Sequence, residues 1–175
     1  FPVDKDGNKI FWAYQLVGWL KDSCGYIRMI PGTDCSKLKA YKKAIEGLIH
    51  INGEDDSDPM KAKEVIIHYP DTGDTSRNCQ RTLRKSGPMG PSTALASSQT
   101  MPKGSYIIFT AETFTKAGYD ILMECLEYGI YHGLGQWRTS GKGIFSYEIL
   151  ADTKGTTPEV EDAPKKKATK KVAAE

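Results

Sequence analysis

The chain has 175 residues, of which 39% are hydrophobic and 26% charged, and its formal net charge is +2. This composition excludes a chain that is disordered throughout, a collagen-like repeat and a coiled coil, and the small net charge does not by itself identify a nucleic-acid-binding protein. No stretch reaches the roughly 18 to 20 consecutive apolar residues of a membrane-spanning helix, so we expect a cytoplasmic protein with no membrane partner.

A change in composition near residue 151 divides the chain. We predict one folded domain over residues 1–151 and a disordered, lysine-rich tail over residues 152–175, which contains no aromatic residue. The lysines of the tail predict nonspecific affinity for phosphate, with a purely solubilising tail as the alternative. Because the chain begins at Phe1, we place a first strand of the domain upstream of it.

The four cysteines indicate the redox environment. They are widely spaced and form no C-x-x-C pair, which argues against a zinc ribbon and against a disulfide-rich scaffold. We expect free thiols in a reducing compartment, with Cys24 and Cys125 buried on the apolar faces of helices. Neither a metal cluster nor a nucleotide fingerprint is present, so we predict no cofactor.

Two helices begin the predicted domain. Apolar residues at helical spacing predict a first helix over residues 14–30 and a second over residues 36–47, with Gly47 as its C-cap. A short strand follows at 48–51. The acidic segment 52–63 lacks the spacing of an EF-hand, which favours an exposed loop over a metal site.

A basic excursion follows the strand predicted at residues 64–69. A weaker strand at 80–84, a cluster of Gly and Pro, and the extended segment 92–99 predict a long exposed hairpin or loop. No acidic residue lies between Asp74 and Glu112, so this part of the chain concentrates positive charge that the net charge conceals. The positively charged residues are Arg77, Arg81, Arg84, Lys85 and Lys103.

The last three elements complete the fold prediction. They are a strand at 105–113, an amphipathic helix at 115–131 and a closing strand at 144–150, in which apolar and polar residues alternate. The order of elements predicts an α+β fold. Its detailed form would be a ferredoxin-like or RRM-like antiparallel sheet, with helices on one face and an extended hairpin or loop excursion.

A glycine-rich loop at residues 133–143 joins the last helix to that strand. Its glycines would let the backbone approach a phosphate, Arg138 and Lys142 would supply positive charge, and Trp137 would stack on a base. The loop is neither a Walker motif nor a Rossmann fingerprint. The pattern therefore predicts a nucleic-acid-binding loop, with a tight connection whose Trp137 covers the core as the alternative.

The loop and its flanks resemble a known family. The segment MPKGSYIIFTAET, then a helix, then GLGQWRTSGKGIFSYEIL is similar to the C-terminal half of the RAMP superfamily, the ferredoxin-like proteins of the crRNA-binding backbone of CRISPR effector complexes. Residues 12–21 resemble the family's motif at its first helix. Gly18 and Lys21 match this motif, whereas Tyr14 and Gln15 replace its serine pair. The resemblance covers residues 10–150.

The resemblance implies a noncatalytic protein that binds single-stranded nucleic acid, with RNA favoured over DNA. The chain would be a small stand-alone or phage-type relative, or a part of a CRISPR-type or phage assembly, with a homo-oligomer or a multi-subunit ribonucleoprotein as its larger form. The residues expected to bind nucleic acid are Lys21, Arg77, Arg81, Arg84, Lys85, Gly133, Gly135, Trp137, Arg138, Gly141, Lys142 and Gly143.

Two alternatives remain open. The same surfaces would serve an assembly or inhibitor module of a phage that docks on protein partners, and salt dependence separates this function from phosphate binding. The other alternative is a metal-independent endoribonuclease, as in processing enzymes of the same superfamily, with a histidine as general acid or base. His132, beside the glycine-rich loop, is the candidate, whereas His50 and His68 fall in predicted strands and read as structural.

Overall fold

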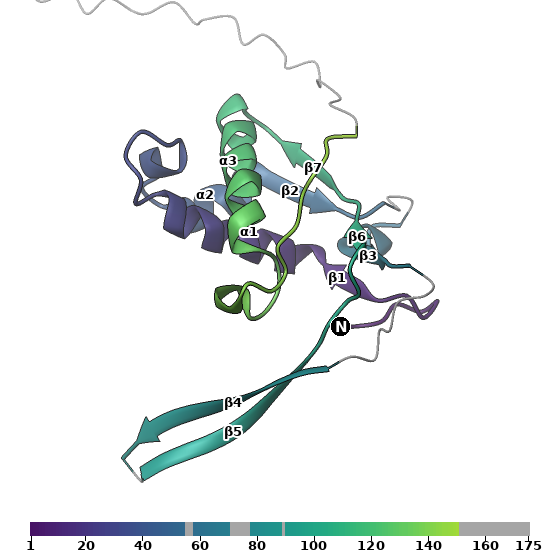
Figure 1. Cartoon of the computed structure of the whole chain (residues 1–175). Coiled ribbons are helices and arrows are strands. Elements are labelled where there is room, and N and C mark those ends of the chain that lie inside the picture. Colours follow the sequence, from purple (N-terminus) through teal and green to yellow (C-terminus); the bar gives the residue numbers. More distant parts are fainter. Residues whose placement is uncertain (55–57, 71–77, 89, 151–175) are drawn as a thin grey trace, which may run out of the picture.

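The computed structural model describes residues 1–54, 58–70, 78–88 and 90–150 (Figure 1). The predicted tail at 152–175 and Arg77 lie outside the described residues. The strands are β1 (Ile10–Trp12), β2 (Ile49–Asn52), β3 (Glu64–His68), β4 (Asn78–Gly87), β5 (Gly90–Gln99), β6 (Tyr106–Ile107) and β7 (Thr110–Thr113). The helices are α1 (Ala13–Ile27), α2 (Tyr41–Leu48) and α3 (Lys116–His132). The predicted α+β class is confirmed.

The two long helices form where the sequence predicts them. The Trp12 N–H donates to Oε1 of Gln15 at the start of α1, and the Thr115 hydroxyl accepts a hydrogen bond from the Gly118 N–H at the start of α3. Helix α1 ends at Ile27, three residues before the predicted end. Pro31 disfavours a helical conformation at the residue before it, which explains the early end.

The prediction of a second helix over residues 36–47 is wrong at its start. A 3-10 turn at Cys35–Lys37 precedes α2, which begins only at Tyr41. Gly47 lies in the last turn of α2, and Ile49 is the C-cap in place of the predicted Gly47. The N–H groups of Asp34 and Cys35 donate to the Glu124 carboxylate of α3, over 2.7 and 2.9 Å. This long-range contact fixes the turn, and local periodicity could not show it.

All strand pairs are antiparallel. Strands β1, β3 and β6 form one sheet in that order, β2 pairs with β7, and β4 pairs with β5. The strand predicted at 105–113 is therefore divided between two partners. A short strand that the sequence analysis did not predict, β1, lies just before α1. In the three-stranded sheet, β3 lies between β1 and β6. The finer ferredoxin-like or RRM-like connectivity stays a prediction.

The prediction of a closing strand at residues 144–150 is wrong, because this described segment forms no strand. Phe145 contacts the ring of Trp19 edge-on, with 5.7 Å between ring centroids. Tyr147 is half-buried, and burial, with Glu127 and Tyr119 nearby, raises its pKa. The alternating pattern therefore reflects packing against the helices.

The core lies between α1, α3 and the β2 and β3 strands. Its fully buried side chains include Leu16, Leu20, Cys24, Ile45, Ile49, Val65, Ile121 and Cys125. All four cysteines are free thiols, and Cys24 and Cys125 are buried as predicted. In the part of the chain that the structure describes, no helix combines the length and apolar character needed to cross a membrane.

The predicted hairpin excursion is confirmed. Strands β4 and β5 pair over ten positions, from Asn78 opposite Gln99 to Gly87 opposite Gly90. Figure 1 shows the hairpin projecting away from the helices. In β4 only Cys79 is half-buried, and the other side chains are exposed.

Candidate nucleic-acid interface

The glycine-rich loop is closed at its base by a backbone hydrogen bond. The Leu134 N–H donates to the Gly143 carbonyl oxygen over 2.8 Å. A Cβ atom at Gly143 would lie 1.9 Å from the Leu134 oxygen, and one at Gly133 would lie 2.6 Å from the Lys142 oxygen. These two glycines are therefore needed for the loop's own closure. Their predicted role in phosphate approach stays a prediction.

The other two predicted glycines face open space. Gly135 and Gly141 have positive φ values of 90° and 71°, and a Cβ atom at either position would meet nothing within 4 Å. Trp137, between them, has φ 66°, which among the described residues makes it the single non-glycine residue in the left-handed region. A large aromatic residue in this conformation is unusual and is typical of positions under functional constraint.

Arg138 is held by an ion pair across the loop. Its Nη2 lies 2.5 Å from Oδ2 of Asp22 on α1, and its side chain is 25% exposed. The Nη1 atom is buried and has no hydrogen-bond partner within the described ranges. The Asp22 carboxylate offsets the charge of Arg138. The phosphate contact predicted for Arg138 stays a prediction.

A pocket of about 360 Å³ opens beside this ion pair. Its lining residues are Tyr26, His132, Gly135, Gln136, Trp137 and Arg138. The rings of Tyr26, Tyr128 and His132 form a cluster, with centroids 6.1 Å apart for the two tyrosines and about 5 Å from His132 to each. Burial, and then the nearby Tyr26, raise the pKa of Tyr128.

Sequence analysis missed Asp22 and Tyr26. Both lie on α1 four residues apart, so they share one face of the helix with Trp19. The Trp19 indole N–H donates to the Gly133 carbonyl over 2.9 Å in the interior, which directs this face toward the loop. The helical spacing of Trp19, Asp22 and Tyr26 could have indicated a shared face toward the loop. The apolar residues of α1 indicated only a core-facing stripe.

The hairpin contacts the glycine-rich loop. Arg81 Nη1 donates to the Ser140 hydroxyl over 3.0 Å, and the Ser98 hydroxyl donates to Oε1 of Gln136 over 2.6 Å. Ser98 pairs with Cys79, so their side chains lie on the same face of the hairpin. Because side chains alternate along a strand, Arg81, two residues after Cys79, lies on that face too. The structure thus brings together two basic segments that lie far apart in the sequence.

The remaining hairpin cations are divided between the two faces. Lys85 shares the face of Arg81, whereas Arg84 lies on the opposite face because side chains alternate along a strand. Lys142 is exposed on the glycine-rich loop. Neither the hairpin strands nor residues 133–143 contain an acidic residue. One face of the hairpin therefore carries two cations, Arg81 and Lys85, and it is the face that contacts the glycine-rich loop.

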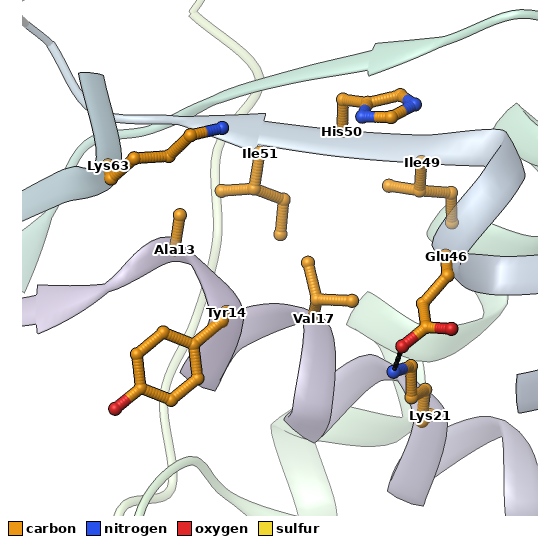
Figure 2. Close-up of a pocket in the computed structure, with 9 residues that line it drawn as sticks. All are labelled: Ala13, Tyr14, Val17, Lys21, Glu46, Ile49, His50, Ile51 and Lys63. Carbon is orange, nitrogen blue, oxygen red and sulfur yellow. Dashed lines mark hydrogen bonds and ion pairs between the residues drawn. The ribbon is translucent and has the colours of Figure 1, made fainter. Parts of the chain in front are cut away.

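Lys21, which the sequence analysis also predicted to bind nucleic acid, lies elsewhere. It forms an ion pair with Glu46 at a second pocket of about 310 Å³, between α1 and β2 (Figure 2). Lys63 and His50 also line that pocket, above a floor of apolar side chains. Neighbouring residues of a helix point in different directions, which is why Lys21 pairs with Glu46 whereas Asp22 pairs with Arg138.

The histidines have different surroundings. His50 packs edge-on against Phe114, and His68 Nε2 lies 2.6 Å from Oε1 of Glu54. His132 contacts the two tyrosine rings and, within the described residues, makes no hydrogen bond that would orient it as an acid or base. No three His, Cys, Asp or Glu side chains in the described ranges are arranged to hold a metal ion.

Comparisons with protein-family models, curated proteins and solved structures find no match to this chain. The similarity to the RAMP superfamily therefore stays a prediction, and the geometry of the loop and hairpin is the basis for a functional proposal.

Proposed function

We propose that the chain is a noncatalytic protein that binds single-stranded nucleic acid, RNA in preference to DNA. Its binding surface is the face that joins the glycine-rich loop to the hairpin. The observation that carries the proposal is the pair of contacts between Arg81 and Ser140 and between Ser98 and Gln136. They make one continuous surface from two segments that each combine positive charge with small residues.

This surface suits a single strand. Lys85, Arg81 and Lys142 would contact successive phosphates, while the aromatic pocket beside the loop would take up exposed bases. A duplex keeps its bases stacked inside, so it would gain only the phosphate contacts. Arg138 would act by fixing the loop through its ion pair with Asp22. The family resemblance favours a role within a multi-subunit CRISPR-type or phage assembly. Free, buried thiols are consistent with a place in the cytoplasm.

Fluorescence anisotropy tests the proposal. Labelled single-stranded RNA, single-stranded DNA and duplex are titrated with the full chain at two salt concentrations. We expect tightest binding to single-stranded RNA, weakening steeply as salt is added. Arg81→Ala combined with Lys142→Ala should lower the slope of log affinity against log salt by about 1.4, because each contact to a single strand contributes about 0.7.

A matched control removes the same charge elsewhere. Lys42 and Lys43 are exposed on α2, so Lys42→Ala combined with Lys43→Ala should leave the salt slope near that of the parent. Equal losses in both double variants would show that net charge alone drives binding. Absence of binding to any nucleic acid at low salt would refute the proposed function.

The exposed hairpin favours one alternative, a module that docks on protein partners. Leu83 is 51% exposed and Leu95 is 66% exposed, and both are large apolar side chains without cover in the described structure. An isolated two-stranded hairpin is marginally stable in water, so a partner protein would stabilise it. Binding through these leucines would change little with salt, which separates it from phosphate binding.

A further inference from the structure

We propose that the pocket beside the glycine-rich loop holds one unstacked nucleobase, with Tyr26 as its stacking platform. This inference rests on the proposed function and assigns the contact that distinguishes a single strand from a duplex. Tyr26 comes from α1, His132 from the end of α3, and Trp137 from the loop, so three separate segments form the walls.

The size of the pocket suits a single base. Its volume of about 360 Å³ lies near the lower end of the roughly 300 to 1,000 Å³ of small-molecule sites. Gly135 borders it without a side chain, and a Cβ atom there would meet nothing within 4 Å. Gly135 therefore leaves its side of the pocket open.

The rings of the pocket provide a stacking surface. Tyr26 and Tyr128 are stacked, with an interplanar angle of 20°, and Tyr26 remains 52% exposed. A base on the exposed side of Tyr26 would continue the stack that Tyr128 begins. Aromatic stacking accepts any base because every base has a π-face, so the pocket would recognise an unpaired base without reading its identity.

The charge balance favours a base over a phosphate. Arg138 lines the pocket, but its charge is offset by Asp22 at 2.5 Å. A phosphate entering here would gain little from a guanidinium whose charge Asp22 offsets, whereas a neutral base needs no net positive charge. Phosphates would remain outside, at Lys142 and Arg81.

The test compares strands with and without bases. A labelled oligouridylate and the corresponding strand with abasic residues are titrated with the full chain. Base stacking on an aromatic residue contributes roughly 1 to 3 kcal/mol, so we expect the intact strand to bind about tenfold more tightly than the abasic one. Tyr26→Ala should abolish this difference, and Tyr26→Phe, which keeps the ring, should preserve it.

Tyr131→Ala is the matched control, because Tyr131 is 83% exposed on α3 and does not line the pocket. It should bind both strands as the parent does. Equal binding of intact and abasic strands by the parent would overturn the inference while leaving the proposed function standing. Loss of binding to every strand would refute the proposed function itself. If Tyr26→Ala fails to fold, the comparison of intact and abasic strands on the parent protein still tests whether a base is bound.

Discussion

The helical body and the β4–β5 hairpin are stabilised in different ways. In the body, α1 and α3 bury Leu16, Leu20 and Ile121 almost completely. The hairpin has ten paired positions, yet nearly all its side chains in β4 are exposed. Burial of apolar surface therefore stabilises the body, whereas the hairpin depends on its ladder of hydrogen bonds and on contacts at its base.

This difference supports the proposed position of the binding surface. A long segment that buries little apolar surface gains little stability from its own packing. We therefore expect such a segment to contact another molecule. The hairpin is anchored to the glycine-rich loop through Arg81 and Ser98, and its remaining length presents Lys85 and Arg84 to the solvent. The body is therefore the scaffold, and the hairpin with the loop is the surface that we propose to bind nucleic acid.

The largest expected effect contrasts one leucine from each region. Leu20 is 1% exposed, so Leu20→Ala removes buried methyl groups, leaves a cavity and should lower the free energy of unfolding by about 3 kcal/mol. Leu83 is 51% exposed, and Leu83→Ala should change the free energy of unfolding by less than about 0.5 kcal/mol. Urea denaturation followed by tryptophan fluorescence measures both. Similar losses in the two variants would show that the hairpin belongs to the core.

The glycine-rich loop belongs to the body at its base and to the binding surface at its tip. Gly143→Ala places a Cβ atom 1.9 Å from the Leu134 oxygen and should destabilise the protein by about 3 kcal/mol. Gly135→Ala meets no atom within 4 Å and should cost about 1 kcal/mol, from its positive φ alone. Thermal denaturation of the two variants measures both losses of stability. A larger loss for Gly135→Ala than for Gly143→Ala would contradict this prediction.

A dependence on pH should appear in the body. The hydrogen bond with Cys35, followed by burial, raises the pKa of Cys24. The folded protein then holds the thiol proton at pH values where the unfolded chain has released it, so stability is full below the ordinary thiol pKa of about 8.5 and falls as pH rises above it. Each pH unit should remove up to about 1.4 kcal/mol. Urea midpoints between pH 7 and pH 10 measure the slope.

Cys24→Ala should make that slope shallower than in the parent, although the variant starts from lower stability because a buried group is lost. An identical slope in parent and variant would show that Cys24 does not contribute to the pH dependence.

The smallest expected effect concerns the anchoring of the hairpin. Arg81→Ala removes the hydrogen bond to Ser140 and should change global stability by about 0.5 kcal/mol or less, because the contact is exposed. Amide hydrogen exchange in β4 and β5 should nevertheless become faster, while exchange in α1 stays unchanged. Arg84→Ala, on the opposite face, is the control. Unchanged exchange in the Arg81 variant would show that this contact does not hold the hairpin.

Local patterns predicted much of the fold. The 3.6-residue stripe of α1, the stripe of α3 and the Gly and Pro cluster of the hairpin all lie within single segments, so periodicity and turn residues sufficed. The start of α2 and the absence of a strand at 144–150 depend on contacts with α3 and Trp19, which are remote in sequence. Such tertiary contacts override local propensity.

The candidate site was predicted in part for the same reason. Trp137, Gly135 and Lys142 were evident from one short segment, and the basic hairpin from another. The neutralising Asp22 and the stacking Tyr26 come from α1, where the sequence showed mainly a core-facing stripe. Lys21 was assigned from a family motif, and its ion pair with Glu46 became visible only in three dimensions.

Hydrogen exchange with and without an oligouridylate at low salt tests whether the hairpin and the glycine-rich loop bind nucleic acid together. We expect simultaneous protection of β4, β5 and residues 133–143, with little change in α2. Protection of the hairpin without the loop, of the loop without the hairpin, or of neither would contradict the claim that the two segments form one nucleic-acid-binding surface.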